Sequence, residues 1–77
     1  MEKELVEFVA KSLVDKPEAV EINQIEGEKS TILELRVDPD DVGKVIGKHG
    51  RIARSLRTIL AASTSRTGKR VVLEILD

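Results

Sequence analysis

The chain of 77 residues carries 13 basic and 14 acidic residues, a formal net charge of −1 at pH 7, and no cysteine. Its length predicts a single domain over residues 1–77, and the lack of cysteine excludes disulfides and thiolate metal sites. No apolar run reaches the roughly 18 residues of a membrane span, and the charged amino-terminal segment is unlike a signal peptide, so we expect a cytoplasmic protein.

The first predicted element is an amphipathic helix over residues 2–15. Pro17 ends it, because proline lacks a backbone donor and clashes with the preceding helical turn. The chain has one aromatic residue, so we expect aliphatic side chains to form the core. Four apolar residues of this helix recur at helical spacing: Leu5, Phe8, Val9 and Leu13.

A hairpin follows, with strands predicted over residues 19–26 and 31–37 and a turn between them. In the first strand Val20 and Ile22 face the same side. Ile25 falls outside that alternation, which predicts a bulge or an early strand end near residues 23 and 24. The second strand has one apolar face, formed by Leu33, Leu35 and Val37.

Residues 38–41 carry a helix-start signal. Asp38 can cap free amides, Pro39 suits the first helical position, and Asp40 and Asp41 favour the positive end of the helix dipole. A short helix is then predicted to bury Val42, Val45 and Ile46. After an interruption at residues 47–50, a helix over about residues 51–65 is predicted to bury Ile52, Leu56, Ile59, Leu60 and Ser63.

Residues 67 and 68 close that helix, and residues 69–76 are predicted to form the last strand, with Val71, Leu73 and Ile75 on one face. The order is α-β-β-α-α-β. The first two strands pair antiparallel, whereas the long helical crossover permits parallel pairing of the second and third. The predicted fold class is therefore α+β, a three-stranded mixed sheet with three helices packed on one face.

The near-neutral total charge conceals an asymmetry along the chain. Residues 1–43 hold five basic and twelve acidic residues, a net charge of −7, whereas residues 44–77 hold eight basic and two acidic residues, a net charge of +6. No acidic residue lies between Lys44 and Arg70. The second part is suited to an anionic partner, and the alternative is that the two parts neutralise each other across the fold.

The most informative segment is V-I-G-K-H-G-R-I-A-R-S-L, over residues 45–56. Gly47 and Gly50 flank the pair Lys48 and His49 where two helices meet, and the second helix opens with free amides that favour an anion. The glycine spacing does not match a nucleotide P-loop, and no dinucleotide fingerprint is present. The segment predicts a clamp for a phosphate backbone, and the alternative is a tight turn with two solvated side chains.

This segment and the element order resemble the type II KH domain, whose GXXG loop clamps about four nucleotides. Residues 47–50 match that loop, Val45 and Ile46 the apolar pair before it, and Leu56 an apolar position after it. Ala53 departs from the pattern, because many KH domains have a larger aliphatic residue there. A lone KH domain of this size is similar to the small single-domain bacterial proteins of the KhpA family.

The resemblance implies binding of single-stranded RNA beside the GXXG loop. The arginines of the second helix recur every three residues and form a stripe that drifts around the helix; the alternative is a solvated helix face. For Ile46, burial in the core is the first expectation and contact with RNA the second. Because the chain has no tyrosine or tryptophan, amides and cations should dominate weak, salt-dependent, loosely specific binding. The predicted RNA-binding residues are Lys44, Ile46, Gly47, Lys48, His49, Gly50, Arg51, Arg54 and Arg57. Three later cations extend that path or decorate a turn: Arg66, Lys69 and Arg70.

The resemblance also implies partners and cellular roles. Members of the KhpA family are associated with self-pairing and with a larger KH-domain partner, KhpB, and with an RNA-chaperone or post-transcriptional role in cell shape and envelope growth. The alternative to RNA binding is therefore a protein-interaction or dimerisation module. The helix predicted over about residues 51–65 carries small residues that would let another chain approach closely, or that simply suit packing on the sheet: Ser55, Thr58, Ala61 and Ala62.

No catalytic or metal site is predicted. His49 is the sole histidine, and no Ser/His/Asp set or ligand cluster can be assembled around it. Helix capping accounts for Asp40 and Asp41. We therefore expect a protein that is not an enzyme and that has no cofactor, no small-molecule substrate and no membrane partner.

Overall fold

The computed structural model of the chain describes residues 1–63 and 68–77. Within them lie three α-helices and three strands, and short 3₁₀ turns connect several of these elements. The residues Thr64, Ser65, Arg66 and Thr67, which include the predicted end of the last helix, lie outside the described residues. The elements are α1 (Glu2–Leu13), β1 (Glu21–Glu26), β2 (Ser30–Arg36), α2 (Val42–Ile46), α3 (Arg51–Ser63) and β3 (Arg70–Leu76).

The sheet has the order β1-β2-β3 and is mixed, as predicted. Strands β1 and β2 pair antiparallel, and β2 and β3 pair parallel through the long crossover that carries α2 and α3. The predicted bulge or early strand end near residues 23 and 24 of β1 is wrong, because the register runs without interruption from Glu21 opposite Arg36 to Glu26 opposite Thr31. Ile25 keeps the alternation by lying opposite Ile32 on the face away from the core, where it is 42% exposed.

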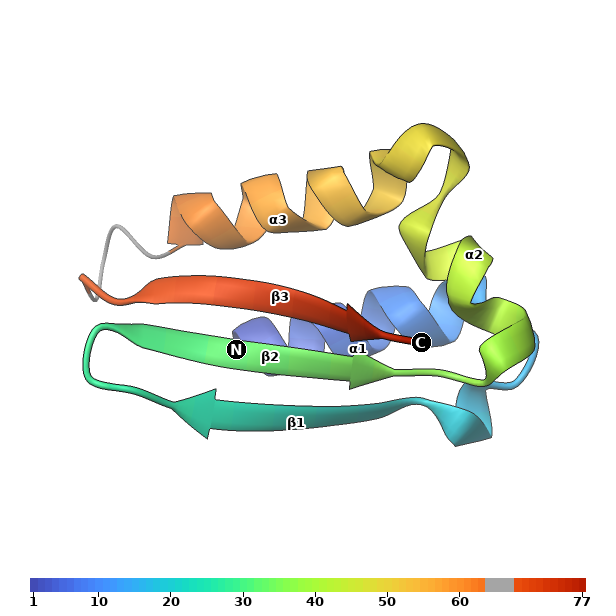
Figure 1. Cartoon of the computed structure of the whole chain (residues 1–77), viewed down its shortest axis with the longest axis horizontal. Coiled ribbons are helices and arrows are strands. Elements are labelled where there is room, and N and C mark those ends of the chain that lie inside the picture. Colours follow the sequence, from blue (N-terminus) through green and yellow to red (C-terminus); the bar gives the residue numbers. More distant parts are fainter. Residues whose placement is uncertain (64–67) are drawn as a thin grey trace.

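The helices pack against one face of the sheet and share a single core cluster with it (Figure 1). Helix α3 runs along β3, α1 lies behind the sheet in that view, and α2 sits near the end of the sheet where β2 finishes. The central strand supplies Leu33 and Leu35, and β3 supplies Leu73, all at most 2% exposed. This is the predicted α+β architecture and the arrangement of a type II KH fold.

The start of the crossover follows from its sequence. Asp38 Oδ1 accepts a hydrogen bond from the Asp40 N–H at 2.9 Å, with Pro39 in the first position of a 3₁₀ turn (Pro39–Asp41) that leads into α2. This is the predicted N-cap. The acidic residue that ends the turn, Asp41, is buried at 1% exposed, which capping alone does not explain.

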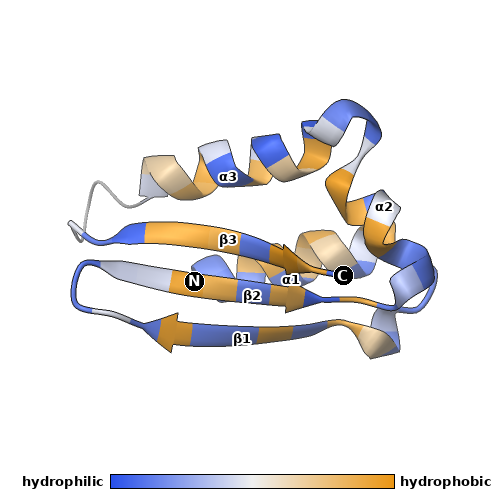
Figure 2. Cartoon of the chain, in the orientation of Figure 1, coloured by the Kyte–Doolittle hydropathy of each residue, from blue (hydrophilic) through white to orange (hydrophobic). Residues whose placement is uncertain are grey.

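The helices bury faces slightly different from those predicted. In α1 the buried residues are Val6 and Ala10, whereas Phe8 is 71% exposed. In α3 the buried residues are Ala53, Leu56 and Leu60, and the predicted burial of Ile59 and of Ile46 in α2 is wrong. Small residues lie on the buried faces of both helices, Ala10 in α1 and Ala53 in α3. The displaced hydrophobic residues remain on the surface, and the hydropathy of the ribbon alternates along each helix (Figure 2).

Candidate nucleic-acid interface

The turn over residues 47–50 joins α2 to α3. The Gly47 N–H donates to the Gly43 carbonyl at 2.9 Å, and the Gly47 backbone takes φ 81° and ψ 167°. That region of backbone conformation is open essentially to glycine alone. A Cβ at Gly47 would also lie 2.9 Å from the Ile52 backbone nitrogen, so this glycine allows the turn to contact α3 directly.

The two residues between the glycines lie at the surface. The Gly50 N–H donates to the Gly47 carbonyl at 3.0 Å and closes a 3₁₀ turn (Lys48–Gly50). His49 takes a left-handed φ of 58°, a conformation in which histidine is enriched among residues other than glycine. Lys48 and His49 are both exposed. Since α3 begins immediately after the turn, the positive end of its dipole lies beside these side chains.

The three arginines of the predicted stripe have different surroundings. Arg54 Nη2 donates to the His49 carbonyl at 3.2 Å and so braces the left-handed turn. Arg57 donates through Nε and Nη2 to the Leu73 carbonyl of β3, each at 3.3 Å. Arg51 is exposed, and within residues 1–63 and 68–77 its side chain has no hydrogen bond or ion pair. The stripe therefore contains one unpaired arginine and two that are attached to the protein backbone.

Lys44 is exposed, but its ammonium is held by two carboxylates. Its ammonium lies 2.7 Å from Asp15 Oδ2 and 3.1 Å from Asp41 Oδ1. The other Asp41 oxygen, Oδ2, accepts the Lys16 N–H at 3.1 Å. These contacts join the chain just after α1 to the start of α2, and we call this set of residues, Asp15, Lys16, Asp41 and Lys44, the α1–α2 clasp.

The clasp keeps a buried carboxylate ionised. Burial raises the pKa of Asp41, but hydrogen bonds from Lys44 and from the backbone N–H groups of Lys16 and Asp15 outweigh that effect, so its pKa lies below the usual value. Hydrogen bonds to Asp15 and Asp41 in turn raise the pKa of Lys44. Lys44 therefore remains charged, with its ammonium committed to two acidic partners.

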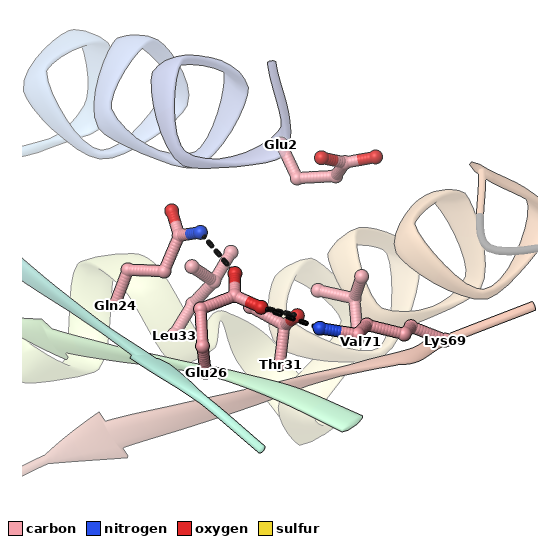
Figure 3. Close-up of a pocket in the computed structure, with 7 residues that line it drawn as sticks. All are labelled: Glu2, Gln24, Glu26, Thr31, Leu33, Lys69 and Val71. Carbon is pink, nitrogen blue, oxygen red and sulfur yellow. Dashed lines mark hydrogen bonds and ion pairs between the residues drawn. The ribbon is translucent and has the colours of Figure 1, made fainter. Parts of the chain in front are cut away.

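A second acidic network lies at the opposite end of the sheet from the turn (Figure 3). Glu26 accepts hydrogen bonds from Gln24 at 2.6 Å, from Thr31 at 3.2 Å and from Lys69 at 2.9 Å. The hydrogen bonds from Lys69 and Gln24 lower the pKa of Glu26. Lys69 is thus fixed to the end of β1, while Arg66, the first of the three later cations, lies outside the described residues.

The surface also carries an apolar groove that the sequence did not reveal. It lies between α1 and α3 and is lined by apolar side chains together with one arginine and one serine: Val9, Leu13, Arg51, Ile52, Ser55, Leu56 and Ile59. Ile59 is 50% exposed there. Of the small residues predicted to admit another chain, Ser55 borders this groove. Ile46, directly before the turn, is a separate exposed apolar residue.

The described residues offer neither a metal site nor a membrane-spanning helix. Residues 1–63 and 68–77 contain no group of three or more His, Asp or Glu side chains placed to hold a metal ion. None of the helices described is long and apolar enough to cross a membrane.

Comparison with known proteins gives consistent matches over the whole chain. The model of the family described as KhpA/KhpB, KH domain, matches residues 3–75. A protein of Borreliella burgdorferi named RNA-binding protein KhpA is 64% identical over 76 residues, which are 99% of this chain and 93% of that protein. Proteins of the same name from Aquifex aeolicus and Treponema pallidum are 61% and 54% identical, over 97% and 100% of this chain and 95% and 96% of their own lengths. No solved structure matches.

Proposed function

Because this chain belongs to the KhpA/KhpB family of KH domains, we propose that it binds single-stranded RNA and holds the phosphate backbone at residues 47–50. The observation that carries the proposal is the geometry of the turn. Two glycines with positive φ place Lys48 and His49 at the surface directly before the positive end of α3. The family is one of binding domains and not of enzymes, in agreement with the sequence prediction.

The predicted RNA-binding residues have different roles in the proposed clamp. Lys48 and Arg51 are unpaired in the described part of the chain, so they are available to phosphate oxygens together with the amides of the turn. Arg54 acts as a positioning residue, because its guanidinium holds the His49 carbonyl. Exposed Ile46 offers an apolar contact to a base beside the turn. Lys44 contributes by fixing α2 to the end of α1.

The test is the double variant Lys48→Asp/His49→Asp, titrated with a labelled single-stranded RNA by fluorescence anisotropy. Two acidic side chains beside the phosphates should weaken binding by at least about tenfold at low salt. The fold should persist, because aspartate tolerates the left-handed backbone of residue 49. Lys29→Asp, in the turn between β1 and β2 at the other end of the sheet, is the control and should bind like the parent protein. Unchanged affinity in the double variant would contradict the clamp.

A second candidate function is favoured by the groove between α1 and α3. Its apolar lining, with Ile59 half exposed, is the kind of surface that another protein covers. The family description names both KhpA and KhpB, and the resemblance associates KhpA-like proteins with self-pairing and with KhpB, so the proposed occupants are a second copy of this chain or a larger KhpB-like KH protein. Light scattering over a range of concentrations tests the first occupant, and titration with the KhpB-like protein from the same cell tests the second.

The resemblance supports a more specific proposal for the cell. We propose that the protein acts in the cytoplasm as an RNA chaperone or post-transcriptional regulator linked to cell shape and envelope growth. An RNA-annealing assay with the parent protein and Lys48→Asp/His49→Asp tests the chaperone role. Annealing that is equally fast with and without the parent protein would contradict it.

A further inference from the structure

Strand β3 presents a free edge beside α3. It pairs with β2 on one side only, because β2 is the central strand. The Arg70 N–H donates to the Lys29 carbonyl, so the backbone groups of residue 70 point toward β2. Backbone groups alternate in direction along a strand, so the N–H and C=O groups of Val71, Leu73 and Ile75 point away from the sheet. An unmodified edge of this kind offers alternating donors and acceptors.

Arg57 changes that edge at its centre. Its Nε and Nη2 both donate to the Leu73 carbonyl at 3.3 Å, although the two residues are 16 positions apart. The contact occupies the acceptor of Leu73 and leaves the Leu73 N–H on the same edge. The other guanidinium nitrogen, Nη1, has no partner in residues 1–63 and 68–77. The middle of the β3 edge therefore presents hydrogen-bond donors, and its acceptor is masked.

The position of Arg57 places the hydrogen-bond donors of the β3 edge within reach of an RNA strand that is bound at residues 47–50. Arg57 is six residues after Arg51 on α3, which corresponds to about 9 Å along the helix axis. Steps of three residues turn the stripe by about 60° each, so it winds from the exposed side of α3 at Arg51 toward the β3 edge at Arg57. A single-stranded RNA whose backbone follows Arg51, Arg54 and Arg57 therefore reaches the Leu73 carbonyl, which Arg57 occupies.

We propose that Arg57 is a specificity-determining residue that favours guanine over adenine at the β3 edge. Guanine presents two neighbouring acceptors, O6 and N7, that match a guanidinium, whereas adenine replaces one of them with the N6 amino donor. Where the Leu73 carbonyl is masked, that amino group meets donors and finds no acceptor. The inference rests on the proposed RNA binding and adds to it a preference among bases.

The experiment compares two labelled RNA octamers, one alternating uridine with guanosine and one alternating uridine with adenosine, so that no binding register has to be known. We expect the parent protein to bind the guanosine octamer about fivefold more tightly, at the lower end of what a bidentate arginine–guanine contact gives, because the edge is open to water. Arg57→Lys keeps the charge but loses the planar fork, and its ratio of affinities should approach one.

Arg51→Lys is the matched control, because it makes the same exchange on the same helix without a strand contact. It should weaken both octamers alike and keep their ratio. An octamer with 7-deazaguanosine, which lacks the N7 acceptor, provides a test that requires no variant: it should bind the parent protein no better than the adenosine octamer. Equal binding of guanosine and adenosine octamers, or a ratio unchanged in Arg57→Lys, overturns the assignment of Arg57. Failure of the parent protein to bind either octamer instead overturns the proposed RNA binding itself.

Discussion

The backbone of Gly47 sets the shape of the turn. Because Ile52 lies close to it, residue 47 requires glycine more strictly than residue 50 does. Both glycines have positive φ, but a Cβ at Gly47 would lie 2.9 Å from the Ile52 nitrogen and 2.7 Å from Ile52 Cγ1, whereas a Cβ at Gly50 meets nothing within 4 Å. The close contact involves backbone, which cannot move aside without shifting α3. The two positions therefore separate backbone strain from steric clash.

Gly47→Ala should lower the free energy of unfolding by about 2–4 kcal/mol, and Gly50→Ala by about 1 kcal/mol. The first variant combines strain with a clash, and the second has strain alone. Urea-induced unfolding followed by circular dichroism gives both values, with the parent protein measured beside them. Equal losses in the two variants would mean that the turn accommodates a side chain at residue 47 and that its contact with Ile52 is not tight.

At the scale of elements, the α1–α2 clasp connects the end of one helix to the start of the next through a buried carboxylate. The folded-state pKa of Asp41 is lowered, so its contribution to stability is present above the unfolded pKa and is lost as the pH falls through the lower, folded value. Protonation of Asp41 would weaken its contacts with Lys44 and with the Lys16 N–H.

Asp41→Asn should therefore flatten the acid limb of the stability curve. We expect the variant to be less stable than the parent protein at about pH 7, and the difference to shrink as the pH falls below about 4. Urea unfolding at several pH values measures both curves. Asp40→Asn, an exposed neighbour in the same 3₁₀ turn, is the control and should keep the acid limb of the parent. Parallel curves for Asp41→Asn and the parent would exclude Asp41 as a source of the acid sensitivity.

The order and pairing of the elements were predictable because each depends on local signals. Alternation marked β2 and β3, Asp38 and Pro39 marked the start of the crossover, and the glycine pair marked the turn. The rotation of each helix about its axis was not predictable to one residue, because apolar spacing alone does not say which of the apolar residues of α3 face the core. Ala53 is 3% exposed, whereas Ile59 is 50% exposed.

The state of each cation in the candidate site was less predictable than the site itself. Lys44 and Asp15 are 29 positions apart, and Arg57 and Leu73 are 16 apart, so no spacing rule links them. The pair Asp41 and Lys44, at helical i, i+3 spacing, was the one available signal that Lys44 is an ion-pair partner. The exposure of Lys48 could be predicted without tertiary information, because Lys48 lies in the short turn between Gly47 and Gly50.

At the scale of the whole molecule, the two interpretations of the charge asymmetry both hold in part. The acidic first part of the chain neutralises Lys44 through Asp15 and Asp41 at one end of the sheet and Lys69 through Glu26 at the other. Among the described residues, no carboxylate pairs with Lys48 or with the three arginines of α3, Arg51, Arg54 and Arg57, so a localised excess of positive charge remains at the turn and along that helix. A protein with net charge −1 can in this way attract a phosphate backbone at one place without attracting nucleic acid over its whole surface.

Within residues 1–63 and 68–77, the α1–α3 groove and the open face of the sheet each expose apolar side chains that an interaction between whole molecules could use. Ile59 lies in the groove at 50% exposed, and Ile25 lies on the open face at 42% exposed, so they form a matched pair of the same residue type. Ile25 also has apolar neighbours, because Ile32 lies opposite it and Val72 lies opposite Ile32, but the groove is a hollow between two helices that includes Val9 and Leu13 of α1. We therefore expect self-association to depend on Ile59.

Ile59→Asp should shift the protein toward the monomer in sedimentation velocity, whereas Ile25→Asp should leave the distribution of the parent protein unchanged. A carboxylate in the groove would be desolvated without a partner when a second copy covers it, which is a large penalty, while both sites accept a charge in the monomer because they face water. The two variants should consequently unfold with similar free energies. A parent protein that stays monomeric at every concentration would contradict self-association, whereas a dimer that survives Ile59→Asp and dissociates with Ile25→Asp would move the interaction surface away from the groove.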